Sequence, residues 1–140
     1  MTAYLNFHTV AAGLNALVLG GMVLLTFVVA PTVFRILDRD LAGALMGAVF
    51  RLALPVFAAA SIGAALLLFY RFDAVLLGAN GAIFLLSWMG LVPLVESLRA
   101  ARAAGEAGAA RRFRLLHGAS QLLNLGQLAL SAFVFFRLAA

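Results

Sequence analysis

Cysteine is missing from this 140-residue sequence, which excludes disulfide bonds, thiolate metal sites and cysteine nucleophiles. Lysine is absent too, so all ten basic residues are arginine. Charge of either sign is scarce, because only 11% of the residues are charged, against about 25% in a typical soluble domain. So few charged side chains cannot cover a surface that faces water, and the composition excludes an ordinary soluble domain.

Apolar residues are abundant instead: 66% of the sequence is hydrophobic. Four nearly uncharged runs cover residues 10–34, 41–70, 74–95 and 115–136. Each is long enough for the roughly 20 residues that cross a bilayer core of about 30 Å. Backbone groups in lipid must form their hydrogen bonds within the segment, so the runs should be helical. None alternates polar and apolar residues as a membrane β-strand does.

The connections set the topology. Residues 35–40 and 71–73 form short polar turns, which place successive helices antiparallel. The third connection, residues 96–114, is longer and rich in Ala, Arg and Glu, which indicates helical extensions around a flexible middle. The sequence therefore predicts one all-α domain over residues 1–140, an integral membrane up-down four-helix bundle. The first run lacks a basic leading segment, so we expect it to be retained rather than cleaved as a signal peptide.

Arginines are distributed unequally between the two sides of the predicted bundle. Eight lie at the first and third connections and the helix ends beside them, and two lie on the opposite side. The eight are Arg35, Arg39, Arg51, Arg99, Arg102, Arg111, Arg112 and Arg114. The positive-inside rule then predicts a multi-pass protein of a bacterial inner membrane with both termini in the periplasm. Nucleic acid is excluded as a partner, because the charges form no basic face on a water-soluble element.

Polar residues form a stripe on the fourth run. They recur at steps of three, four and seven, within a sector of roughly 120° of a helix, and comprise His117, Ser120, Gln121, Asn124, Gln127 and Ser131. Polar residues at membrane depth avoid lipid and face the bundle interior. They either bond other helices, at about 0.6 kcal/mol per contact, or line a binding cavity. Asn80 and Ser87 on the third run are candidate partners.

The second run contains Arg51, whose charge costs about 2.5–3.5 kcal/mol near the bilayer centre. It must pair with Glu96 or Asp38, reach the headgroups with its long side chain, or bind an anion or lipid headgroup. Gly43 and Gly47 form a small-xxx-small pattern that predicts close helix packing.

The two histidines raise the question of haem or a metal ion, for which histidine is a common ligand. His8 lies at the outer end of the first run and His117 at the inner end of the fourth, so an up-down bundle keeps them apart. We therefore predict no metal site and no cofactor, and no nucleophile–base–acid arrangement indicates an enzyme. Pro31, Arg35, Glu96 and His117 converge on the inner face, where a site is most expected.

Two motifs carry a resemblance to a known family. Residues 27–35, with Ala-Pro-x-x-Phe, and residues 112–124, with Leu-His-Gly-x-Ser-x-x-x-Asn, resemble the transmembrane-protein-205-like family of small four-helix membrane proteins. The resemblance covers essentially the whole chain. It implies a four-span fold and no particular reaction, and it places any site around the motif positions Pro31, Phe34, Gly43, Gly47, His117, Ser120 and Asn124. More distantly, His8 followed by Gly20-Gly21 is similar to copper-resistance membrane domains and membrane protoporphyrinogen oxidases, although the tryptophan usual before those glycines is absent.

The preferred hypothesis is a non-enzymatic inner-membrane protein that binds a small molecule or lipid in its polar interior near the cytoplasmic face. One alternative is a haem- or metal-dependent redox protein that uses His117 or His8. Another is a subunit or assembly factor of a larger membrane complex, and a homo-oligomer fits the same composition.

Overall fold

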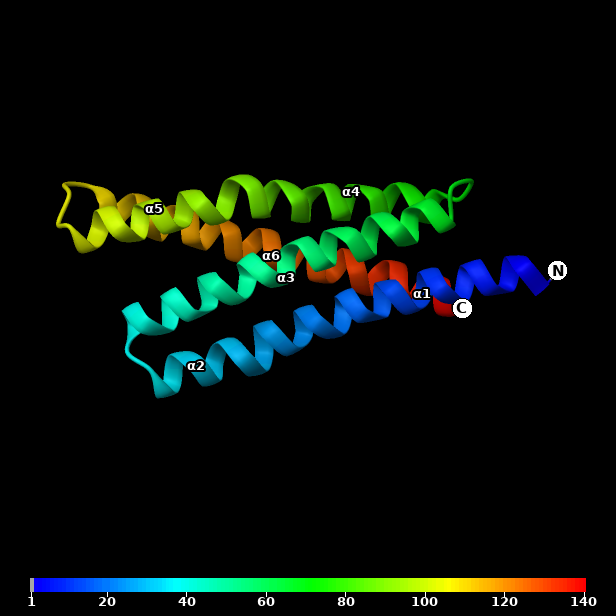
Figure 1. The fold of residues 1–140 in the computed structure, drawn as a ribbon, viewed down its shortest axis with the longest axis horizontal. Helices are drawn as coiled ribbons and strands as arrows, with labels where there is room; N and C mark the ends of the chain where they lie inside the picture. Colours follow the sequence, from blue (N-terminus) through cyan, green and yellow to red (C-terminus); the bar gives the residue numbers. More distant parts are fainter. Residues whose placement is uncertain (1) are drawn as a thin grey trace.

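The computed structural model describes the backbone of residues 2–140 and the side chains of residues 7–140. Within that range the chain is helical and makes four antiparallel passes (Figure 1). The first pass joins α1 (Thr2–Val23), η1 (Leu24–Val29) and α2 (Ala30–Ile36); the second is α3 (Arg39–Leu67). The third joins α4 (Phe72–Leu86), η2 (Ser87–Leu91) and α5 (Val92–Ala103); the fourth is α6 (Ala109–Ala139). Four helices are thus long and apolar enough to cross a membrane among the residues described. The predicted all-α, four-span bundle is confirmed.

The helices continue past the uncharged runs. The third pass extends to Ala103 and the fourth starts at Ala109, so the third connection is a tight link rather than the whole charged segment. Alanine and arginine are strong helix formers, which explains why the charged ends stay helical. Gly105 and Gly108 have φ angles of +74° and +76°, a conformation that glycine adopts without steric cost, and they turn the chain between α5 and α6.

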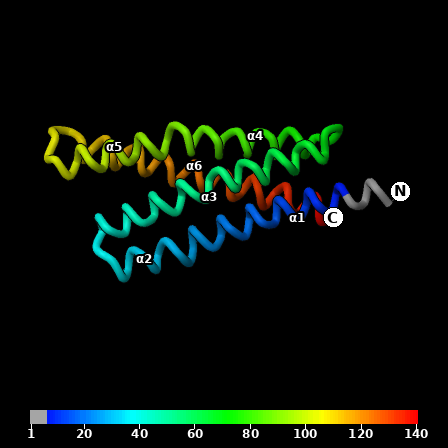
Figure 2. Tube along the Cα trace, viewed as in Figure 1, coloured from blue at the N-terminus to red at the C-terminus, as the bar shows by residue number. Residues whose placement is uncertain are grey.

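The first and third connections meet at one end of the bundle, which we call the arginine-rich end because it carries eight of the ten arginines. Arg102 of α5 donates to Asp40 of α3 at 2.6 Å and joins the two connections. Asp38 accepts hydrogen bonds from the amides of Asp40 and Leu41 and so caps α3. The described start of α1 and the C-terminus lie at the opposite end, as Figure 1 shows, and Figure 2 shows the C-terminus at that end too.

Two π-helical turns interrupt the first and third passes, and each is followed at once by a proline. Pro31 follows η1 and Pro93 follows η2, each at the start of the next α-helix. A proline in a helix clashes with the carbonyl four residues earlier, here that of Phe27 or Met89. A wider π turn relieves this clash, and such turns are frequent at functional sites.

The termini half of the bundle is tightly packed. Buried apolar side chains fill it, among them Ala11, Ala64, Leu77, Val134 and Leu138. Asn15 donates to the Ser131 carbonyl and Asn80 donates to the Ser131 hydroxyl, both at 2.9 Å. Asp73, with a side chain only 3% exposed, accepts from Arg137 of α6 at 2.7 Å. These contacts join all passes except α3 through polar groups, and α3 packs closely along α4.

The two halves of the bundle differ in shape. Near the termini the passes converge, whereas towards the arginine-rich end α2 and α5 lie far apart in Figure 1. A cavity is therefore expected in this half of the bundle.

Candidate functional site

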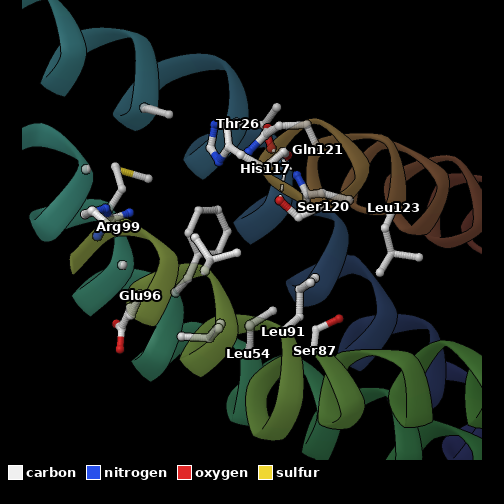
Figure 3. Close-up of a pocket in the computed structure, with 18 of the residues that line it drawn as sticks. Thr26, Leu54, Ser87, Leu91, Glu96, Arg99, His117, Ser120, Gln121 and Leu123 are labelled. Atoms are coloured by element: carbon white, nitrogen blue, oxygen red, sulfur yellow. Dashed lines mark hydrogen bonds between the residues drawn. The ribbon is translucent and has the colours of Figure 1, made fainter. Parts of the chain in front are cut away.

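A cavity of about 390 Å³ lies between the four passes towards the arginine-rich end. Every pass contributes to its lining, and Figure 3 shows the labelled side chains arranged around one space. Glu96 and Arg99 lie on one side, and His117, Ser120 and Gln121 lie across from them. The volume falls within the range of about 300–1,000 Å³ that is typical of small-molecule sites.

Apolar side chains make most of the wall. They come from all four passes and comprise Ala30, Pro31, Phe34, Met46, Phe50, Leu54, Leu91, Val92, Val95 and Leu123. The polar side chains are fewer and comprise Thr26, Ser87, Glu96, Arg99, His117, Ser120, Gln121, Asn124 and Gln127. A mostly apolar wall with a few polar groups is the usual make-up of a ligand pocket.

The polar stripe of α6 serves two purposes along its length. His117, Ser120, Gln121, Asn124 and Gln127 line the cavity. Ser131, one turn further, lies beyond it in the hydrogen-bonded network with Asn15 and Asn80. The stripe therefore combines both roles: its first part lines the cavity, and Asn124 and Ser131 also bond to other passes.

Three hydrogen-bonding groups follow the length of the cavity. The Asn124 amide donates to the Thr26 hydroxyl of η1 at 3.1 Å. The Ser120 hydroxyl donates back to the His117 carbonyl at 2.7 Å. The Gln127 amide nitrogen is buried and has no hydrogen-bond acceptor among the described residues. A buried polar atom without a partner costs about 1–3 kcal/mol, and the side-chain oxygens of Asn15, Ser61 and Asn80 are likewise buried without a hydrogen-bond partner among the described residues.

Two charged side chains, Glu96 and Arg99, line the part of the cavity nearest the arginine-rich end, which we call its mouth. Arg51 donates to Glu96, one of the two carboxylates considered for it from the sequence; the other, Asp38, caps α3 instead. Glu96 lines the cavity, while Arg51 lies outside it with more than half of its side chain exposed.

Gly43 and Gly47 face side chains rather than a neighbouring backbone. A Cβ atom at Gly43 would lie 3.3 Å from Arg99 Nε, and one at Gly47 would lie 3.3 Å from Arg99 Nη1 and from Glu96 Oε1. The small-xxx-small pattern predicts close approach of two helices, but here it makes room for the charged groups of α5. Sequence spacing alone cannot distinguish the two uses.

The Phe113 ring contacts several side chains near the N-terminal end of α6. The Phe113 ring stacks on His117, with ring centroids 5.6 Å apart and planes 6° apart. The guanidinium carbons of Arg102 and Arg99 lie 4.7 Å and 6.0 Å from the same ring centroid. Cations within about 6 Å of an aromatic face are attracted to it, so Phe113 holds both arginines close to His117.

Several residues singled out from the sequence lie elsewhere. Arg35 is exposed and does not line the cavity, and Asn80 belongs to the packed network of the termini half. His8 lies on α1, near the opposite end from His117. Among the described side chains no three His, Asp or Glu residues are grouped closely enough to hold a metal ion.

Arg99 and Thr26 line the cavity but were not identified as site residues from the sequence. Arg99 belongs to a charged run that is typical of a solvated linker, and only the helical extension of α5 brings it back over the cavity. Thr26 is an isolated hydroxyl in an apolar run, and the π turn of η1 carries it to Asn124. Neither placement has a local sequence signal.

The fold and the cavity define a four-helix membrane protein with a cavity between its four passes. Residues 13–104 match the family described as Domain of unknown function (DUF4149), and the chain belongs to that family. The match covers the first three passes from residue 13 up to α5, which supply most of the apolar wall and both charged lining residues, Glu96 and Arg99. No curated protein and no solved structure gave a significant match.

Proposed function

We propose that this protein binds a small amphiphilic molecule or lipid in the cavity and does so without catalysing a reaction. The observation that carries the proposal is the composition of the lining. Hydroxyl and amide groups of α6 face apolar walls from α2, α3 and α5, so a guest with one polar and one apolar part finds a matching surface.

Interhelical bonding alone does not account for the polar lining. Asn124 has a partner on another pass, but the buried Gln127 amide nitrogen has none among the described residues. Gln121 is exposed to the same space. In lipid, a polar group without a partner is costly, so these side chains are better explained by a bound molecule than by packing.

The motifs that resemble the transmembrane-protein-205-like family support the same location. Pro31 and Phe34 of the first motif line the cavity from α2, and His117, Ser120 and Asn124 of the second line it from α6. We also propose that this chain is a member of the transmembrane-protein-205-like family. The arginine distribution further supports a bacterial inner-membrane location with the cavity near the cytoplasmic face.

Retention of endogenous molecules tests the proposal directly. The protein is extracted in mild detergent, and native mass spectrometry records any mass bound to the folded chain. Ala30 lines the cavity, so Ala30→Trp should fill it and abolish the bound mass. Ala59→Trp is the matched control, because Ala59 is exposed on α3 and does not line the cavity.

We expect a reproducible bound species in the native protein and in Ala59→Trp, and none in Ala30→Trp. A native protein that carries no molecule and takes up no added amphiphile would remove the proposal.

A further inference from the structure

Arg99 differs from the other charged groups of the cavity in having no acidic partner. Its guanidinium lies over Gly43 and Gly47, in the space that a side chain at either position would occupy. No carboxylate lies within 4.0 Å of it in the described part of the chain. Its guanidinium carbon lies 6.0 Å from the centroid of the Phe113 ring, whose face attracts the cation without neutralising its charge.

The acidic side chains near Arg99 are already engaged. Glu96 pairs with Arg51, Asp40 pairs with Arg102, and Asp38 caps α3. Glu106 lies exposed in the link between α5 and α6 and does not line the cavity. Arg99 is therefore a guanidinium of the cavity lining that is not paired with a carboxylate in the described part of the chain.

We infer that the cavity accepts an anionic amphiphile with a single alkyl chain, whose phosphate or carboxylate group is bound by Arg99. This inference rests on the proposed function and adds the sign of the ligand's charge and the residue that recognises it. The planar guanidinium donates two parallel hydrogen bonds to an oxyanion, and such charge-assisted bonds are strong where water is scarce.

The shape of the cavity indicates an amphiphile rather than a free anion. The apolar wall continues from Arg99 into the bundle along Met46, Phe50 and Leu54 of α3. From His117 at the mouth to Gln127 at the deep end, α6 rises by about 15 Å. A volume of about 390 Å³ suits one chain with its head group.

Three probes in neutral detergent separate the parts of the inference: dodecyl phosphate, dodecanol and inorganic phosphate. Dodecyl phosphate has the same alkyl chain as dodecanol and the same anionic group as inorganic phosphate. Binding is measured by native mass spectrometry and by titration calorimetry. Dodecyl phosphate should bind to the native protein roughly tenfold to a hundredfold more tightly than dodecanol, as expected for hydrogen bonds to a charged group. Inorganic phosphate should bind negligibly.

Arg99→Gln should remove the preference for dodecyl phosphate and leave dodecanol binding unchanged. Arg111→Gln is the matched control, because Arg111 is exposed at the same end and does not line the cavity. Thermal unfolding of both variants in detergent checks that they fold, and Arg99→Lys, which keeps the charge, should retain part of the preference.

The outcomes are distinguishable. Equal binding of dodecyl phosphate and dodecanol to the native protein, or an unchanged preference in folded Arg99→Gln, would overturn the inference and leave the proposed function standing. Tight binding of inorganic phosphate would assign the site to a free anion and also overturn the inference. Failure of both alkyl probes to bind would remove the proposed function itself.

Discussion

At the scale of single residues, the close packing of α4 against α3 depends on Gly81. A Cβ atom there would lie 2.7 Å from the Ile62 side chain and 3.2 Å from backbone atoms of Ala58 and Ile62 on α3. Backbone atoms inside a helix cannot move aside as the end of a flexible side chain can. Gly81 therefore sets the distance between α3 and α4, the pair that closes the termini half.

Gly81→Ala should lower the stability of the folded protein by about 1–3 kcal/mol, the usual range for overpacking. Gly78, nearly one turn earlier on α4, is the matched control: its Cβ would meet Ala65 at an ordinary 3.8 Å. Gly78→Ala should be neutral or stabilising by up to about 1 kcal/mol, because alanine is the better helix former. Thermal unfolding in one detergent measures both. Equal melting temperatures would contradict this account of the α3–α4 contact.

At the scale of the helices, the π turns place polar groups in the cavity. η1 contributes Thr26, and η2 contributes Ser87. The extra residue of each turn rotates the helix before it relative to the helix after it, so the same sequence in a regular α-helix would present different side chains to α6. Pro31 and Pro93 keep the turns in place because each excludes a regular hydrogen bond.

Pro31→Ala should allow η1 to become α-helical and separate Thr26 from Asn124. The absence of cysteine makes this measurable: with Thr26→Cys and Asn124→Cys introduced together, the two thiols should crosslink in membranes. Adding Pro31→Ala should reduce the crosslinked fraction several-fold. Thr26→Cys with Leu122→Cys is the control pair, since Leu122 is 73% exposed. Undiminished crosslinking with Pro31→Ala would show that the π turn does not depend on the proline.

The sequence predicted the elements better than the site, for physical reasons that particular residues illustrate. Hydropathy and the cost of free backbone groups in lipid determine four helical passes, and the 3.6-residue period places His117, Ser120 and Asn124 on one face. The sequence offered two carboxylates, Glu96 and Asp38, as partners of Arg51. It could not choose Glu96, because that choice depends on how α3 and α5 cross. The partner of Gly43 and Gly47 is likewise a tertiary contact, so neither it nor Arg99 had a signal in local spacing.

At the scale of the whole molecule, the two ends of the bundle differ in charge. Four acidic residues accompany the eight arginines at the arginine-rich end, whereas Asp73 faces Arg71 and Arg137 at the other. Asp73 is buried and joins α4 to α6, so the termini end is closed by an ion pair as well as by apolar packing. The membrane orientation of such a molecule follows from its arginines.

Single cysteines should report that orientation in intact bacterial cells. Tyr70 is 95% exposed in the turn at the termini end, and Glu106 is exposed in the link at the arginine-rich end. A maleimide that cannot cross membranes should label Tyr70→Cys in intact cells and Glu106→Cys only after permeabilisation. The native chain, which has no cysteine, gives the background. The reverse labelling pattern would place the cavity on the outer face and contradict the predicted orientation.

The cavity begins among charged side chains at one end and stops near the middle of the bundle, where close packing takes over. If the proposed ligand is an amphiphile dissolved in the bilayer, it would reach Arg99 from a single leaflet. Molecules that are made or inserted in the opposite leaflet must first flip across the bilayer, so the occupancy of this protein would follow the lipid composition of one half of the membrane and be insensitive to the other.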